Sequence, residues 1–171
     1  GHDPAFAPHG RATVGELQLH PNSRNVIPGR ARFTVDLRHE DAATLDRMEA
    51  RFRAAAAALA EAPGPQGGAG LSVSVVDVQD FPPTPFDPAL VAAVRASAQA
   101  RGLTQQDIVT GAGHDAVYMA RVVPTAMVFV PCKDGISHNE VEDADPDHLA
   151  AGANVLLDVL LQQAGLVGGA R

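Results

Sequence analysis

Four prolines fall within residues 81–88, FPPTPFDP, near the middle of the 171-residue chain. Proline has no backbone N–H and a fixed φ, so neither a helix nor a central strand continues through such a stretch. We therefore predict two domains, residues 1–80 and residues 81–171, on either side of this linker.

The first part has the pattern of a hairpin followed by a helix. Residues 12–20 and 31–38 alternate between apolar and polar, as strands with one buried face do, and Gly15 predicts a bulge in the first of them. Turn-forming residues connect the two, which favours antiparallel pairing. Asp41 is the predicted cap of a helix about five turns long. Its expected apolar stripe consists of Leu45, Met48, Phe52, Ala56 and Leu59.

Alternation at residues 71–75 predicts a third strand, so the first part is expected to be an antiparallel sheet with a helix on one face. The second part alternates between helix and strand, with strands predicted at residues 108–109 and 125–130. Asp87 and Asp145, each followed by proline, are predicted to begin helices. The expected stripe of the last helix consists of Leu149, Ala153, Leu156, Leu157 and Leu160. This order is typical of an α/β sheet whose other strands lie outside the chain.

Composition excludes several classes of protein. With 46% hydrophobic and 19% charged residues the chain is expected to be globular, and its net charge of −7 without a basic stripe argues against nucleic-acid binding. Cys132 is the only cysteine, which rules out an internal disulfide and a zinc ribbon. We find neither a signal peptide nor a membrane-length apolar run, so a cytoplasmic location is expected. The chain starts without Met, which suggests that it was cut from something longer.

The segment GISHNE, residues 135–140, follows the strand predicted at residues 125–130. It is therefore predicted to be a loop at the carboxyl end of that strand, a position where ligands commonly bind. His138 can bind a metal or transfer a proton, and Asn139 and Glu140 could fix the orientation of its ring. The alternative is a loop histidine that only contacts water.

The segment GAGHDA, residues 111–116, predicts a glycine-rich turn into a helix that continues through Arg121. Backbone N–H groups at a helix start can hold an anion, and His114 lies in or near that position. The third glycine of a dinucleotide-binding turn is absent. The alternative is a helix start whose first-turn donors are satisfied by Asp115.

Asn25 and Arg38 form a second possible anion site, a clamp for a carboxylate, because a guanidinium binds carboxylates through paired hydrogen bonds. The alternative is that Arg38 is an exposed charge paired with Asp36 or Glu40. The remaining histidines, among them His9 and His39, are expected to face solvent.

Four segments in series carry a resemblance: PNSRNVIPG at residues 21–29, FTVDLRH at 33–39, GAGHDA at 111–116, and MVFVP followed by GISHN within 127–139. Together they resemble the zinc-dependent amidohydrolases of the hydantoinase/carbamoylase family. This group includes N-carbamoyl-L-amino-acid hydrolases, allantoate amidohydrolases and β-alanine synthases. The resemblance extends from about residue 12 to 161.

The resemblance implies an α+β lid, which forms a homodimer, and an α/β catalytic part of metallo-aminopeptidase type. Residues 1–80 would be the later part of the lid, and residues 81–171 the carboxyl-terminal part of the catalytic domain. It also implies two divalent metal ions per active site, zinc first, with manganese, cobalt or nickel as alternatives.

The resemblance also implies roles for single residues. His138 would be a metal ligand, His114 a catalytic residue, Gly113 part of the substrate site, and Asn25 and Arg38 the carboxylate clamp. The substrate would be an N-carbamoyl amino acid or a related ureido acid. The other ligands and the general base would lie upstream, so the segment alone is expected to be inactive. Two alternatives stay open: a non-catalytic dimerisation or binding module, and a related metallopeptidase or aminoacylase.

Overall fold

Strands β1 (Arg11–His20) and β2 (Arg30–Arg38) form an antiparallel hairpin, after a short 3-10 helix η1 (Pro4–Phe6). The structure, a computed structural model, describes residues 4–64 and 70–165. The register of the hairpin shifts between Val14 and Leu17, where the Glu16 N–H donates to Thr34 Oγ1 at 3.1 Å. The bulge predicted at Gly15 is therefore confirmed.

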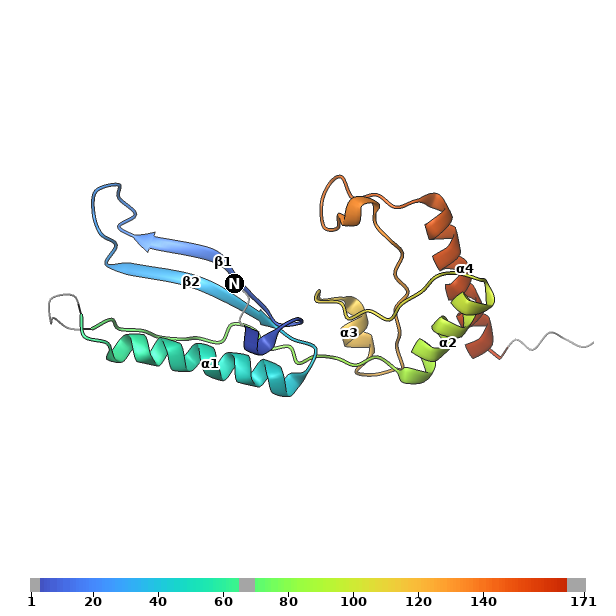
Figure 1. Ribbon diagram of the computed structural model, residues 1–171, viewed down its shortest axis with the longest axis horizontal. Helices are drawn as coiled ribbons and strands as arrows, with labels where there is room; N and C mark the ends of the chain where they lie inside the picture. The colour runs from blue at the N-terminus through green and yellow to red at the C-terminus, as the bar shows by residue number, and fades with distance from the viewer. Residues whose placement is uncertain (1–3, 65–69, 166–171) are drawn as a thin grey trace, which may run out of the picture. The chain divides into compact units, whose positions relative to one another are not determined.

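Helix α1 (Ala42–Glu61) begins where the sequence predicts it. The Asp41 carboxylate accepts hydrogen bonds from the Thr44 N–H at 2.9 Å and the Thr44 hydroxyl at 2.6 Å. Met48 is buried, whereas Leu59 at the far end of the predicted stripe is 56% exposed. Figure 1 shows α1 running beside the hairpin, and the buried side chains of the helix, Thr44 and Met48, belong to its first turns.

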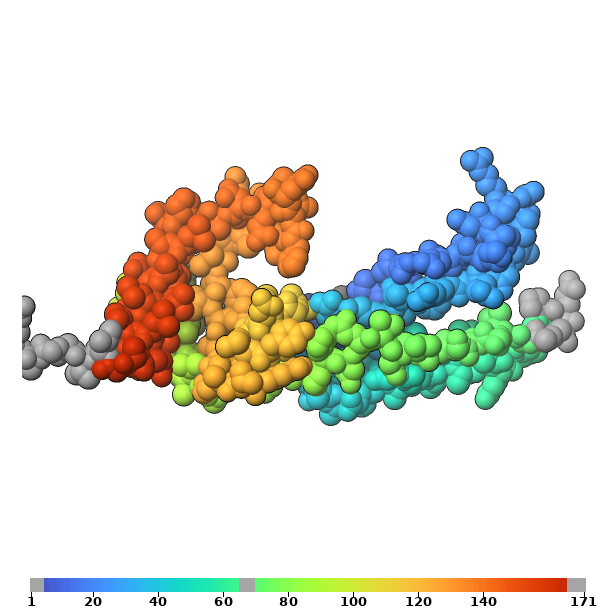
Figure 2. Space-filling view, turned by 180° about the vertical axis from the view of Figure 1, so that it is seen from behind, coloured from blue at the N-terminus to red at the C-terminus, as the bar shows by residue number. Residues whose placement is uncertain are grey.

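The third strand predicted at residues 71–75 is not formed. Residues 70–80 run in an extended conformation along α1 (Figures 1 and 2), and the Arg53 guanidinium pairs with the Asp77 carboxylate between the two segments. The sheet in the described residues has two strands, and neither hydrogen-bonds to this segment as a neighbour. Alternation in a sequence predicts which side chains share a face, but a strand also needs a hydrogen-bonding partner.

The chain divides into two units, Gly1–Pro83 and Thr84–Arg171. This division lies within the proline-dense stretch. The roles of lid and catalytic part stay predictions.

In the second unit, helices α2 (Pro88–Ala100) and α4 (Pro146–Gln163) pack together around Ala98, Val155 and Val159, which are buried. Both helix starts were predicted correctly. The Asp87 carboxylate accepts from the Leu90 N–H at 2.8 Å, and the Asp145 carboxylate accepts from the Asp147 N–H at 2.8 Å.

The apolar stripe predicted for α4 is wrong. The buried side chains are Val155 and Val159, whereas Leu149, Leu156, Leu157 and Leu160 are about half exposed. Apolar residues cover more than one face of this helix, and α2 covers only the face that carries the two valines. The leucines are therefore left without cover by the described residues.

The chain between these two helices contains less regular structure than predicted. Helix α3 (Asp115–Met119) ends before Arg121, and residues 108–109 and 125–130 are extended without a strand partner among the described residues. A 3-10 helix η3 (Lys133–Gly135) precedes α4. Among the described helices, none combines the length and apolar character needed to cross a bilayer.

Candidate functional site

The loop that carries His138 has a strongly constrained backbone. Three of its residues have positive φ: Asp134 at 55°, Gly135 at 69° and His138 at 55°. Non-glycine residues rarely adopt this region, so contacts must hold it in place. The Glu142 carboxylate Oε2 accepts a hydrogen bond from the His138 N–H at 2.8 Å and provides one such contact.

The base of the same loop is closed by its ends. Cys132 and Ala144 form an antiparallel bridge, and the Lys133 N–H donates to the Asp143 carbonyl at 2.7 Å. Cys132 is half-buried, and its sulfur lies 3.9 Å from Glu142 Oε1. The imidazole of His138 is thus presented from a closed loop.

The residues predicted to orient the His138 ring do not do so in the described structure. The Asn139 side-chain oxygen accepts from the Val141 N–H at 3.1 Å instead, and no contact joins Glu140 to the imidazole. Glu142, which holds the His138 backbone, was missed from sequence. The spacing of four residues between His138 and Glu142 was the available signal, but acidic residues are common in loops.

The described residues do not by themselves provide a metal site. A protein-bound zinc ion takes three or four protein ligands, and residues 4–64 and 70–165 contain no group of three or more histidine, cysteine or acidic side chains that could hold an ion. His138 is exposed and could serve as one ligand. The set would have to be completed from outside these residues.

His114 lies immediately before α3, and its ring is held on two sides. Its Nε2 lies 2.9 Å from the Thr110 hydroxyl oxygen, which also accepts from the Ala112 N–H at 3.2 Å. The ring of Phe129 meets the imidazole edge to face, with the centroids 5.7 Å apart and the planes at 65°. His114 is therefore a half-buried, oriented imidazole, and Thr110 is a partner that sequence reasoning did not find.

The glycines beside His114 leave open space. A Cβ placed on Gly111 or Gly113 would meet no atom within 4 Å in the described structure, and neither residue has a positive φ. Packing and backbone conformation therefore do not explain why glycine stands there. The role of Gly113 in a substrate site stays a prediction.

The start of α3 differs from the interpretation in which Asp115 satisfies the first-turn donors, and the anion-site interpretation stays a prediction. His114 occupies the cap position without a side-chain hydrogen bond to the helix, and Asp115 is a first-turn residue and not the cap. With five residues, α3 has too small a dipole to make an anion site by itself.

Arg38 forms a two-point ion pair with Asp36. Its Nε lies 2.7 Å from Asp36 Oδ1 and its Nη2 lies 2.9 Å from Oδ2. These hydrogen bonds lower the pKa of the Asp36 carboxyl and raise the pKa of the Arg38 guanidinium. The pairing with Asp36 is the alternative that the sequence left open, and both side chains are about half exposed.

Asn25 and Arg38 lie far apart within one chain, and their joint role in a carboxylate clamp stays a prediction. Asn25 lies in the loop between the strands, where its side-chain oxygen accepts from the Ser23 hydroxyl at 2.9 Å. Arg38 lies at the opposite end of β2, across from Arg11. Strand β2 spans about 26 Å at the usual rise of ~3.3 Å per residue. One hairpin therefore cannot bring both side chains to one carboxylate.

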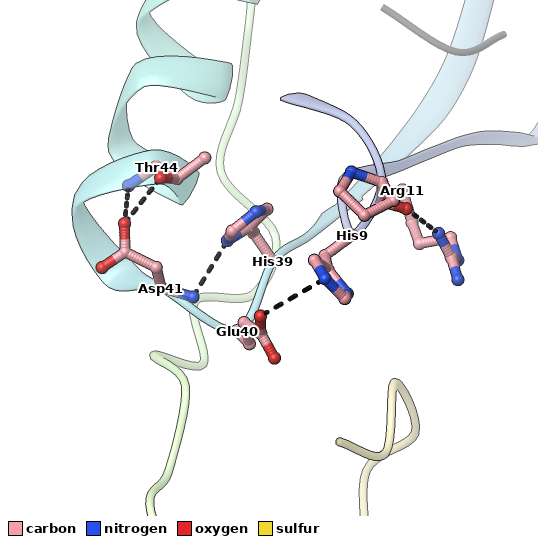
Figure 3. A network of polar contacts seen from close by, with 7 residues as sticks. His9, Arg11, His39, Glu40, Asp41 and Thr44 are labelled. Atoms are coloured by element: carbon pink, nitrogen blue, oxygen red, sulfur yellow. Dashed lines mark hydrogen bonds and ion pairs between the residues drawn. The ribbon is translucent and has the colours of Figure 1, made fainter. Parts of the chain in front are cut away.

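A polar network connects the start of β1, the end of β2 and the start of α1 (Figure 3). The His39 Nδ1 accepts from the Asp41 N–H at 2.9 Å, and His9 Nε2 lies 3.9 Å from a Glu40 carboxylate oxygen. The rings of His9 and His39 stand perpendicular, with their centroids 6.4 Å apart. His39 is half-buried, so the expectation that it faces solvent is only partly right.

A hollow in the second unit lies away from the predicted residues. It is lined by the segment before α2 and the turn after α3, including Phe86, Val122 and Pro124. None of the predicted site residues contributes to its lining.

Residues 12–162 match the model of Peptidase family M20/M25/M40. The chain is 45% identical over 154 residues to an N-carbamoyl-L-amino-acid amidohydrolase from Rhizobium meliloti, covering 90% of the chain and 36% of that protein. It is 34% identical over 154 residues to an allantoate amidohydrolase from Bacillus subtilis, with the same coverage of 90% and 36%.

Solved structures give a consistent result. The chain superposes with a TM-score of 0.82 on an amidase of the hydantoinase/carbamoylase family from Burkholderia multivorans, at 54% identity. The match covers 94% of the chain and 38% of that structure. The chain thus spans little more than a third of the length of the proteins it matches.

Proposed function

Because the chain belongs to peptidase family M20/M25/M40, we propose that it is the carboxyl-terminal part of a hydrolase that cleaves non-peptide C–N bonds. The relatives support this chemistry, because their names describe amidohydrolases of N-carbamoyl amino acids and of allantoate. Both substrates combine a ureido group with a carboxylate. An N-carbamoyl amino acid or a related ureido acid is therefore the substrate class that we assign.

The uncovered apolar surface of the second unit supports the idea that the chain works as part of something longer. The half-exposed leucines of α4 are one surface that a larger sheet would cover. The segment at residues 125–130, which has no strand neighbour among the described residues, is another. A single exposed histidine also cannot hold an ion alone. We therefore expect the 171-residue chain to be inactive by itself.

His138 is the residue of this chain that we assign to a metal. An imidazole on a closed loop can offer a ring nitrogen without reorganising its backbone, and the remaining ligands would come from the rest of the protein. When bound, divalent metal would supply Lewis-acid chemistry at the substrate carbonyl. Two ions are expected per complete site, zinc first, with manganese, cobalt or nickel as alternatives.

Arg38 is the residue that we assign to the substrate carboxylate, because its guanidinium already binds a carboxylate, that of Asp36, through two hydrogen bonds. Substrate would then compete with Asp36 for the same donors. Asn25 cannot join Arg38 within one chain, so a two-point clamp requires Asn25 from one copy and Arg38 from another. This requirement supports the homodimer expected for the first unit. In the second unit, Gly113 and His114 are the residues that we assign to substrate binding.

The proposal is tested on the whole protein that contains this chain. We expect it to hydrolyse N-carbamoyl amino acids, and His138→Ala to remove activity together with bound metal. His148→Ala, which changes an exposed histidine on α4, is the matched control and should change neither. A whole protein that binds no metal and cleaves no ureido acid would overturn the proposal. Cleavage of N-acyl amino acids instead would favour an aminoacylase.

A further inference from the structure

The contact between Thr110 and His114 specifies where the proton of the imidazole lies. Thr110 Oγ1 is 2.9 Å from His114 Nε2 and also accepts from the Ala112 N–H at 3.2 Å. A threonine hydroxyl has one proton to donate and two lone pairs to accept with. Ala112 uses one lone pair, which leaves the hydroxyl proton and one lone pair for the imidazole.

The hydroxyl proton has one acceptor within reach. Among residues 4–64 and 70–165, the acceptor for the Thr110 hydroxyl proton is Nε2 of His114. Both side chains are partly buried. If Nε2 carried the ring proton, the threonine oxygen would accept twice and its own proton would be left without a protein partner. Such a group costs free energy where water is partly excluded. The arrangement that satisfies both groups is O–H donating to Nε2.

We propose that Thr110 is a positioning residue that holds neutral His114 with its proton on Nδ1. The other ring nitrogen is then occupied by Thr110 and cannot act as a base. The edge contact with Phe129 restricts rotation of the same ring. Thr110 and Phe129 together fix both the tautomer and the plane of the imidazole.

This assignment determines what His114 can offer a ligand. In the described residues Nδ1 has no hydrogen-bond partner, so its N–H is a donor that is free to bind an oxygen. If the proposed function holds, on which this step rests, that oxygen belongs to the carboxylate or ureido group of the substrate. His114 therefore binds and polarises an oxygen and does not remove a proton.

Nitrogen NMR of the imidazole tests the tautomer directly. The whole protein is labelled with 15N-histidine, and the His114 signal is identified by its loss in His114→Asn. At a pH where the ring is neutral, the wild type and Thr110→Ser should both show the proton on Nδ1. Thr110→Val keeps the shape but lacks the hydroxyl, and should shift the proton toward Nε2.

Two results overturn the inference: a wild-type ring with its proton on Nε2, or a Thr110→Val ring unchanged from the wild type. If Thr110→Val does not fold, the wild type and Thr110→Ser still decide the matter. The measurement needs no turnover, so it is independent of the proposed function. A ring with its proton on Nδ1 in a protein that hydrolyses no ureido acid would overturn the function alone.

Activity supplies a second readout. Thr110→Val should lower kcat/KM by about tenfold, as expected for one lost positioning hydrogen bond. Thr110→Ser should restore most of it. Thr125→Val is the matched control, because the Thr125 hydroxyl donates to the Val123 carbonyl at 3.0 Å and does not reach His114. Equal losses in Thr110→Val and Thr125→Val would mean a merely structural role.

Discussion

The carboxylate of Glu142 holds the backbone of His138, because its Oε2 accepts the His138 N–H at 2.8 Å. His138 has a φ of 55°, a conformation that costs a non-glycine residue roughly 1–2 kcal/mol. Glu142 therefore stabilises the backbone from which the imidazole projects, although it does not touch the ring.

Glu142→Ala should release this backbone. We expect the His138 amide to exchange with solvent about tenfold faster, the effect of losing one hydrogen bond of moderate strength. Hydrogen exchange followed by NMR measures it. Glu142→Gln keeps an acceptor oxygen and should retain most of the protection, and Glu140→Ala, an acidic residue in the same loop, should have no effect. Similar exchange in all three variants would contradict this role.

Gly152 on α4 is required by a close approach to Val130. A Cβ at this position would lie 2.6 Å from Val130 Cγ1. Replacing glycine by alanine inside an exposed helix usually stabilises it by about 1 kcal/mol. Here we expect Gly152→Ala to destabilise the protein instead, by roughly 1–3 kcal/mol, because overpacking outweighs helix propensity.

Urea denaturation gives the sign of that change. The double variant Gly152→Ala, Val130→Ala should recover part of the loss, because the methyl group that clashes has been removed. A stabilising Gly152→Ala would show that α4 is free to move away from residues 125–130.

Asp158 predicts a pH dependence for the contact between α2 and α4. Hydrogen bonds from Arg101 and Ser97 lower the pKa of its carboxyl to about 2. The unfolded chain titrates this group near pH 4, about its ordinary value. Its stabilising contribution is therefore complete above about pH 4 and is lost progressively as the pH falls through about 2.

Asp158→Asn should lower the thermal unfolding midpoint at pH 7, and the difference from the wild type should shrink as the pH falls from 4 to 2. Arg101→Gln removes the same pair from the other side and should follow the same profile. Calorimetry at pH 7, 4, 3 and 2 measures both. A difference that persists unchanged at pH 2 would show that Asp158 acts through packing and not through its charge.

The separation of Asn25 and Arg38 predicts complementation between inactive variants of the whole protein. In the homodimer proposed above, Asn25→Ala and Arg38→Ala should each lose most activity, because every site would then lack one group. When the two variants are mixed and allowed to exchange subunits, half of the sites in each mixed dimer are intact. About a quarter of wild-type activity should return on statistical mixing. No recovery, despite exchange confirmed by mass, would mean that the clamp does not cross between copies.

Local structure was largely predictable from the sequence. The hairpin, the bulge at Gly15 and the caps Asp41, Asp87 and Asp145 each depend on residues a few positions apart, so one sequence contains the whole signal. The fold class, mixed helix and strand, and the family were also correct.

The errors have a common cause: a sequence pattern does not specify which segment will pair with or pack against another. The segments 71–75 and 125–130 have strand patterns but lack hydrogen-bonded neighbours in the described residues. The buried face of α4 depended on which of its apolar faces α2 would cover. The joint role of Asn25 and Arg38 stays a prediction, made on chemical grounds alone, although the hairpin sets them at opposite ends.

For the candidate site, the sequence predicted which loops carry the histidines, but it did not predict which side chains contact them. The loops that carry His114 and His138 could be predicted, because the glycines close to each histidine in the sequence indicate turns. Thr110 and Glu142 were not found, since threonine and glutamate are common and carry no motif of their own. Their roles become clear only from the structure, in which Thr110 contacts the His114 ring nitrogen Nε2 and Glu142 accepts from the His138 N–H.

Residues 125–130 have no strand neighbour among the described residues, and this gives the second unit an open strand edge. An apolar segment with such an open edge can pair with a strand of another polypeptide. Supplied as a separate polypeptide, the rest of the protein would be expected to dock there and reassemble the sheet. At high concentration the same segment would pair with other copies of itself, so the order of mixing would decide between reconstitution and aggregation.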